Sequence, residues 1–209
     1  MLLDVHTHHL PADPGMAILN QTFDEPIIPE AHYLSLSVHP WSLTITNLPH
    51  QLRWVKSHLS DPRVIALGET GLDKLCAVPL PLQERAFRAM ASISEQHRLP
   101  LILHVVKCAA EIIALKKELH PSMPWIIHGF RGKVELAQTY LRQGFYLSFG
   151  ERYQDAALQF VPSSRFLLET DENTVDISEL YKRAARLRNL SPDLLVQGVT
   201  STLSTLFFQ

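Results

Sequence analysis

Cysteine is nearly absent from this chain of 209 residues, in which Cys76 and Cys108 are the only two. They do not have CxxC spacing, and two cysteines cannot build the set of crosslinks that staples small secreted domains. The sequence therefore predicts no disulfide framework. Its hydrophobic fraction of 46% is high enough for a sizeable packed core instead.

The chain also lacks a surplus of charge and any long apolar run. Its 19 basic and 21 acidic residues leave a net charge of −2, which argues against a surface made wholly for nucleic acid but allows a local basic rim. No apolar run approaches the roughly 20 residues of a membrane-spanning helix. A strand expected from residue 2 leaves no room for a secretory signal. We therefore expect a soluble cytoplasmic protein without a membrane partner.

Neither repeats nor low-complexity linkers are visible, so we expect one domain over residues 1–209. Eight apolar runs have the character of strands, and from residue 47 onward helical periodicity separates them. The expected strands are 2–6, 16–23, 33–38, 64–67, 101–103, 125–127, 145–149 and 166–168. The expected helices are 47–60 (with Asn47 as N-cap), 82–97, 109–119, 134–142, 155–160, 177–189 and 192–207.

Eight strands that mostly alternate with helices predict a (β/α)8 TIM barrel of the α/β class. The chain is shorter than the ~250 residues typical of that barrel. The shortfall lies in the first two connections, 9–15 and 24–32, which are rich in proline and too short for long helices. We therefore expect a barrel with reduced helices after its first two strands.

Five of the expected strands end in residues that can bind a metal or transfer a proton. These residues are His6 and His8, Glu69, His104, His128, and Asp171 with Glu169 before it. In a parallel barrel such strand ends gather at one end of the sheet. Imidazoles and carboxylates in that number suit a pair of divalent metal ions, and therefore hydrolysis.

The first of these endings is Asp4-Val5-His6-Thr7-His8. Side chains alternate along a strand, so His6 and His8 point to the same side and can bind one metal together. An isolated HxH motif also fits two ordinary polar histidines. Asp4 lies on the same face, where it is either an acceptor that fixes the His6 tautomer or a hydrogen bonder at the strand end.

Glu69 and Asp171 are the candidate catalytic residues. A carboxylate can bridge two metals whereas an imidazole cannot, so we predict that Glu69 is the bridging ligand. The alternative is a turn, in which Gly71 supplies a positive φ. Asp171 can ligate a metal and take a proton from the attacking water.

Three further histidines follow apolar runs. His104 and His128 stand at equivalent places after successive strands, which favours metal ligation over the alternative of core histidines satisfied by backbone carbonyls. His39, before Pro40, either contacts the substrate or simply ends its strand.

Several motifs in chain order resemble those of the TatD family of metal-dependent deoxyribonucleases, in the amidohydrolase-like barrel superfamily. They are His6-x-His8, Val38-His39-Pro40, Gly68-Glu69-x-Gly71-Leu72-Asp73, Leu103-His104, Ile127-His128-Gly129-Phe130, Gly144 to Phe149, and Leu168-Glu169-Thr170-Asp171. The resemblance covers nearly the whole chain and implies Zn²⁺, Mg²⁺ or Mn²⁺ as the metal. It implies metal ligands at His6, His8, Glu69, His104, His128 and Asp171.

The residues around these positions depart from the family pattern, and the chain is a short variant. Lys74, Lys107, Arg131 and Lys133 follow proposed ligands in loops at one end of the expected barrel. Clustered cations favour a phosphate-bearing substrate, although each alone also fits a solvated loop side chain. We predict that these four residues and His39 bind the substrate.

We therefore predict a TatD-like hydrolase, a deoxyribonuclease or phosphodiesterase that uses two divalent metal ions to activate water. An alternative is the same site acting on a small phosphomonoester, or on an ester or amide such as an aminoacyl-tRNA linkage. A more remote alternative is a binding barrel without activity. The expected partner is DNA or a small phosphoester, and no obligate protein partner is predicted.

Overall fold

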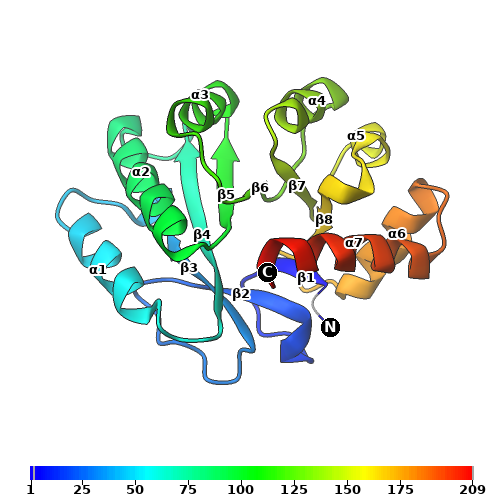
Figure 1. Cartoon of the computed structure of the whole chain (residues 1–209), viewed down its shortest axis with the longest axis horizontal. Helices are drawn as coiled ribbons and strands as arrows, with labels where there is room; N and C mark the ends of the chain where they lie inside the picture. Colours follow the sequence, from blue (N-terminus) through cyan, green and yellow to red (C-terminus); the bar gives the residue numbers. More distant parts are fainter. Residues whose placement is uncertain (2, 209) are drawn as a thin grey trace. The chain divides into compact units, whose positions relative to one another are not determined.

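The computed structural model describes Met1 and residues 3–208 (Figure 1). Within these residues the strands are β1 (Asp4–Thr7), β2 (Ala17–Gln21), β3 (Tyr33–Val38), β4 (Val64–Asp73), β5 (Leu101–Val106), β6 (Trp125–Ile127), β7 (Tyr146–Phe149) and β8 (Phe166–Leu168). The α-helices are α1 (Leu48–His58), α2 (Leu80–His97), α3 (Ala109–Leu119), α4 (Val134–Arg142), α5 (Asp155–Phe160), α6 (Ile177–Leu187) and α7 (Pro192–Phe207). Short 3-10 helices are η1 (Pro14–Met16), η2 (Pro40–Ser42) and η3 (Ser163–Arg165).

The chain divides into two compact units. Unit 1 consists of residues 1–19 and 126–209, and unit 2 consists of residues 20–125. Unit 1 therefore holds β1, β7 and β8 with the four C-terminal α-helices, whereas unit 2 holds β3, β4 and β5 with the first three α-helices. The expectation of one domain over residues 1–209 stays a prediction.

The strands have the connectivity of a barrel sheet. They follow one another in chain order from β1 to β8, and the pairs with a described register are parallel. Inside unit 1, β8 returns to β1 through a parallel bridge between Thr7 and Asp171. Eight parallel strands in this order are the sheet of a TIM barrel, so the predicted fold class is confirmed.

The core of unit 2 is built by helices that pack on its central strands. Phe87, Met90 and Ile93 recur at helical spacing along α2 and are buried where this helix packs on β4. The ring of Phe87 meets that of Trp125 edge-to-face, with centroids 5.0 Å apart. α1 contacts both β3 and α2 (Figure 1). These contacts fix the strands that carry the candidate site residues of this unit.

The core of unit 1 is aromatic. Phe149 on β7 stacks on Phe166 of β8 with centroids 5.3 Å apart, and Tyr140 of α4 packs on Phe145. α6 packs on β8 and on α7, and its Tyr181 hydroxyl donates a hydrogen bond to the carbonyl oxygen of Leu3 at 2.8 Å. The strands that carry the N-terminal and C-terminal site residues are thereby tied into one core.

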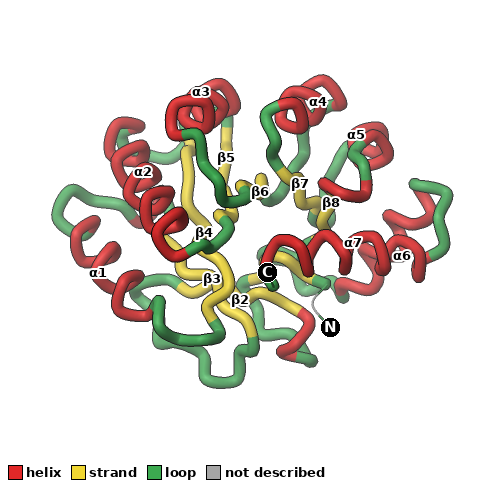
Figure 2. Tube along the Cα trace, in the orientation of Figure 1, coloured by secondary structure: helices red, strands yellow, loops and turns green. Residues whose placement is uncertain are grey.

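The first two connections lack α-helices, as predicted. η1 is the only helical turn between β1 and β2, and the connection from β2 to β3 is loop throughout (Figure 2). The strand predicted over residues 2–6 corresponds to β1, and Leu2 lies outside the described residues. In the part of the chain that the structure describes, no helix is both long and apolar enough to span a membrane.

One local expectation was wrong, and a second was met only in part. β4 and β5 continue past the predicted ends at residues 67 and 103, because their backbones keep pairing as far as Asp73 and Val106. Asn47 is the N-cap residue of α1, but its side chain does not cap the helix. Its Oδ1 instead accepts a hydrogen bond from the Thr44 amide at 2.7 Å, which stabilises the preceding turn.

Candidate functional site

In unit 1 the ends of β1 and β8 are held together by their backbones. The His8 amide donates to the Asp171 carbonyl, and the Asp171 amide donates to the His6 carbonyl, both at 3.0 Å. Asp171 adopts a left-handed φ of 57°, which Asp tolerates better than most residues. This pairing sets the carboxylate of Asp171 beside both histidines of the HxH motif.

Three ligand atoms converge there. Asp171 Oδ1 lies 3.6 Å from His6 Nε2 and 3.8 Å from His8 Nε2. His6 is fully buried, whereas the side chains of His8 and Asp171 keep 25% and 17% of their exposure. The three residues form a group whose ligand atoms all lie within 4.8 Å of one another. The group thus has one buried member, His6, and two members, His8 and Asp171, that solvent can reach.

His128 follows β6 and faces a buried carboxylate, Glu169. Its Nδ1 lies 3.3 Å from Glu169 Oε1, which also accepts a hydrogen bond from the Gly129 amide at 2.5 Å. If Nδ1 carries the proton, Glu169 orients the ring and leaves His128 Nε2 as the ligand atom. The centroid of the His128 ring lies 4.7 Å from that of His6. His128 therefore belongs with the histidines of β1.

Glu169 is charged in this setting. Complete burial raises the pKa of its carboxyl, but the imidazoles of His128 and His6 together lower it further, so that its pKa lies below the ordinary value. Its Oε2 is buried, with no hydrogen-bond partner among the described residues. A nearby cation would stabilise a buried carboxylate oxygen that has no hydrogen-bond partner.

Asp4 serves the backbone. It accepts hydrogen bonds from the His6 amide at 3.2 Å and the Thr170 amide at 3.1 Å, and from the Thr170 hydroxyl at 2.7 Å. Burial raises the pKa of Asp4 to about 7, against the lowering by its Thr170 and His6 hydrogen bonds. Of the two roles considered for Asp4, these contacts show the hydrogen bonder that joins the ends of β1 and β8.

In unit 2, Glu69 lies inside β4 between two glycines that permit close contact with β5. Gly68 and Gly71 have φ of 118° and 154°. A Cβ atom would lie 2.2 Å from the Ile102 carbonyl oxygen at Gly68, and 2.0 Å from that of His104 at Gly71. The glycines therefore serve strand packing rather than the turn considered as an alternative.

Glu69 and His104 are in direct contact. His104 Nδ1 lies 2.7 Å from Glu69 Oε1, and its Nε2 lies 3.3 Å from Asp73 Oδ2. A neutral imidazole carries one N–H and can donate to only one of these carboxylates. With Nε2–H donated to Asp73, Nδ1 and Glu69 Oε1 turn electron pairs toward the same region. That arrangement suits a metal cation.

Asp73 and Asn20 hold this pair in place. Burial raises the pKa of Asp73, but hydrogen bonds from the Trp41 indole, the Leu75 amide and His104 lower it below the ordinary value. Asn20 Oδ1 accepts a hydrogen bond from the Glu69 amide at 2.9 Å. Asp73 thus contacts the His104 ring, and Asn20 contacts the Glu69 backbone, so both help to position the candidate ligands.

His39 ends β3 and joins Glu69 and His104 in a second compact group of potential ligands. Its Nδ1 accepts a hydrogen bond from the Trp41 amide at 3.2 Å, so the neutral ring carries its proton on Nε2. That Nε2 lies 3.4 Å from Glu69 Oε1. A metal-bound histidine shows the opposite arrangement, because its second nitrogen donates. His39 therefore fits the predicted substrate contact better than a ligand role.

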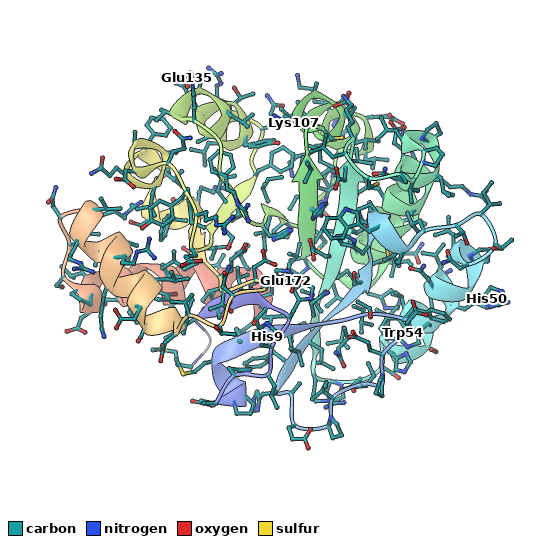
Figure 3. The ribbon with its side chains drawn as sticks, turned by 180° about the vertical axis from the view of Figure 1, so that it is seen from behind. His9, His50, Trp54, Lys107, Glu135 and Glu172 are labelled. Atoms are coloured by element: carbon teal, nitrogen blue, oxygen red, sulfur yellow. The ribbon has the colours of Figure 1, made fainter. Side chains whose placement is uncertain are left out.

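The four predicted substrate cations are exposed, but their surroundings differ. Lys74 donates to the carboxylate of Glu111. Lys107 stands just past β5 (Figure 3), and its backbone has a left-handed φ of 54°. Arg131 and Lys133 lie in unit 1 in the loop before α4, where Lys133 is the N-cap residue. Their binding of substrate stays a prediction.

Sequence reasoning gave little weight to three residues of these clusters. Glu169 was named among the polar strand endings but given no role of its own, although alternation along the chain places it on the same face as Asp171. Asn20 is a polar residue in a buried strand, a signal that could have marked it. Trp41 carries no periodic signal, and its contacts depend on tertiary structure.

Comparison with known proteins identifies the family. The family model described as TatD related DNase matches residues 21–207, so the chain belongs to this family. The uncharacterized metal-dependent hydrolase YabD of Bacillus subtilis is 29% identical over 167 residues, which are 71% of this chain and 65% of YabD. The 3′-5′ ssDNA/RNA exonuclease TatD of Cronobacter turicensis is 30% identical over 162 residues, 73% of this chain and 61% of that protein. The chain thus spans less than two thirds of either relative.

Solved structures agree on the fold. The crystal structure of YJJV, a TatD homologue from Escherichia coli, matches with a TM-score of 0.81 at 20% identity, over 99% of this chain and 97% of that one. At this identity the likeness establishes the fold alone. The resemblance to the TatD family and the predicted barrel fold are both confirmed.

Proposed function

We propose that this chain is a metal-dependent phosphodiesterase that cleaves single-stranded DNA or RNA. The observation that carries the proposal is the convergence of His6 Nε2, His8 Nε2 and Asp171 Oδ1 at the ends of two paired strands. Membership in the TatD-related family supports it, as does a relative named as a 3′-5′ ssDNA/RNA exonuclease.

The residues present fit divalent metal ions. Their donors are imidazole nitrogens and carboxylate oxygens, which Zn²⁺ accepts and, for the carboxylates, Mg²⁺ and Mn²⁺ also accept. The buried Oε2 of Glu169 calls for a positive charge nearby, and so do His104 Nδ1 and Glu69 Oε1 when His104 carries its proton on Nε2. The proposed ligands are His6, His8, Glu69, His104, His128 and Asp171. The bridging role of Glu69 stays a prediction.

When bound, divalent ions lower the pKa of water and stabilise negative charge on phosphoryl oxygens. The protein side chains supply the rest. Asp171 accepts the proton of the attacking water, which its partial exposure allows. His39 donates from Nε2 to a substrate oxygen, and the exposed Lys107, Arg131 and Lys133 attract the phosphate backbone.

The direct test is cleavage of labelled oligonucleotides by the purified chain with Mg²⁺, Mn²⁺ or Zn²⁺. Single-stranded DNA and RNA should be shortened, and a small phosphomonoester and an aminoacyl ester should be turned over far more slowly. Glu69→Gln should remove the ion of the unit 2 cluster and the activity together, because the neutral amide cannot balance a cation. Full nuclease activity in Glu69→Gln would overturn the assignment.

Glu135→Gln is the matched control. Glu135 lies in the first turn of α4 on the surface of unit 1 (Figure 3). The same change there should leave metal content and cleavage rate as in the wild type. A wild-type protein that cleaves only the monoester or the aminoacyl ester would move the proposal to that substrate class.

A further inference from the structure

Trp41 is an exposed tryptophan whose ring is nevertheless fixed. It stands in η2, directly after His39 and Pro40, and 65% of its surface is exposed. Its indole Nε1 donates a hydrogen bond of 2.7 Å to Asp73 Oδ2. Asp73 is itself held in place, since it is buried and its Oδ1 accepts a hydrogen bond from the Leu75 amide at 2.7 Å.

The indole also adjoins the candidate ligands of unit 2. Its ring meets that of His39 edge-to-face at 5.0 Å between centroids, and that of His104 at 5.5 Å. The interplanar angles are 88° and 81°. Asp73 thus contacts His104 and Trp41 with the same oxygen, so the position of the indole is coupled to that of a proposed metal ligand.

The other tryptophans of the chain have ordinary packing roles. Trp54, on α1 (Figure 3), packs against Phe23 and His58. Trp125 is fully buried against Phe87. Trp41 is therefore the tryptophan that combines high exposure with a hydrogen bond that holds its ring.

A fixed, exposed indole is suited to stacking. An exposed side chain ordinarily loses rotamer freedom when a ligand orders it, which weakens binding. The hydrogen bond to Asp73 has already restricted the Trp41 ring, so a planar ligand can stack on it with little further loss. Every nucleobase offers such a plane, and base–aromatic stacking tolerates any sequence.

We propose that Trp41 is the stacking platform for one nucleobase of the substrate, beside the phosphodiester that the metal-binding residues act on. This inference rests on the proposed nuclease function and adds to it a specificity-determining residue. It predicts that the enzyme prefers a nucleotide with a base over an abasic one at a single position. The identity of the base should matter little.

The test is a scan with a single tetrahydrofuran abasic site moved along a fluorescent oligodeoxythymidylate. Dissociation constants would be measured by anisotropy, with the full-length, metal-loaded protein and with cleavage blocked by a phosphorothioate backbone. At one position the abasic site should weaken binding to the wild type about tenfold. In Trp41→Leu this difference should vanish, and in Trp41→Phe, which keeps a ring but loses the hydrogen bond, it should be intermediate.

Trp54→Phe is the matched control and should keep the full abasic penalty. The circular dichroism of Trp41→Leu, and its metal content at a saturating metal concentration, should match the wild type, which separates loss of stacking from loss of fold or metal. Trp41→Leu with an unchanged abasic penalty would overturn the role of Trp41 while leaving the nuclease proposal intact. A wild type that neither binds nor cleaves any oligonucleotide would overturn both.

Discussion

The two clusters of candidate ligands consist of the same residue types, histidines and carboxylates, but their strands hold them in different ways. In unit 1, His6, His8 and Asp171 stand at the ends of two short strands whose backbones are bonded to each other. In unit 2, Glu69 and His104 lie inside two longer strands that pair well beyond them. The first cluster depends on strand ends, and the second on glycines that let β4 approach β5.

The clusters nevertheless share one device. His128 has Glu169 behind one ring nitrogen, and His104 has Asp73. Each carboxylate is buried, and each has a pKa below its ordinary value. A carboxylate behind an imidazole fixes its tautomer and makes it a better metal ligand. The two regions thus share a carboxylate that orients a histidine, and they differ in strand geometry.

The largest effect on activity is expected from Asp171→Asn, which removes a proposed ligand from the cluster of unit 1. The amide cannot accept the proton of the attacking water and holds a cation poorly. We expect the rate of oligonucleotide cleavage to fall by about 10³-fold or more. Asp155→Asn, an exposed change in the first turn of α5, is the control and should retain activity. A loss below tenfold in Asp171→Asn would remove this residue from the chemistry.

Gly71→Ala tests whether the cluster of unit 2 depends on the close approach of β4 to β5. A methyl group there meets the His104 carbonyl oxygen at 2.0 Å, at a φ that alanine rarely adopts. We expect a loss of about 3 kcal/mol in the free energy of unfolding, measured in urea. Gly198→Ala in α7 of unit 1, where a Cβ makes an ordinary contact at 3.6 Å, should instead be neutral or slightly stabilising. Equal effects of the two changes would contradict the close-packing argument.

Removing the orienting carboxylates probes the device that the clusters share. Glu169→Gln and Asp73→Asn keep the size of each side chain but remove its charge. Each should weaken metal affinity by about 10- to 100-fold in a competition titration with a chelating dye. An effect in one cluster alone would show that the two histidines are oriented by different means.

The pH dependence of stability should distinguish Asp4 in unit 1 from these charged carboxylates. Its pKa of about 7 in the folded chain lies above the ordinary 3.8, so the folded state holds a proton that the unfolded state releases. Stability is therefore lost as the pH rises from about 4 to about 7. Between pH 5 and 6, in EDTA, this loss should be about 1 kcal/mol and absent in Asp4→Asn. Identical slopes in the two proteins would contradict the raised pKa.

The sequence carried more information about the residues than about their surroundings. The alternation of apolar runs predicted the barrel and most element bounds, and the polar residues after five of the eight runs marked the candidate ligands. The true ends of β4 and β5 were out of reach, because they depend on pairing such as that of Gly71 with His104. The tautomer of His39 depends on the Trp41 amide, and the exposure of Trp41 depends on how η2 leaves β3. Such contacts form only in the folded chain, and the periodicity of the sequence does not indicate them.

If the two clusters each hold a divalent ion, as we propose, the metal content of the purified chain will show it. Protein loaded with Zn²⁺ or Mn²⁺ and freed of excess ion would be analysed by mass spectrometry. We expect two ions per chain in the wild type, about one each in Asp171→Asn and His104→Ala, and none in the double variant. A wild type with no ion, or single variants that keep both, would contradict it.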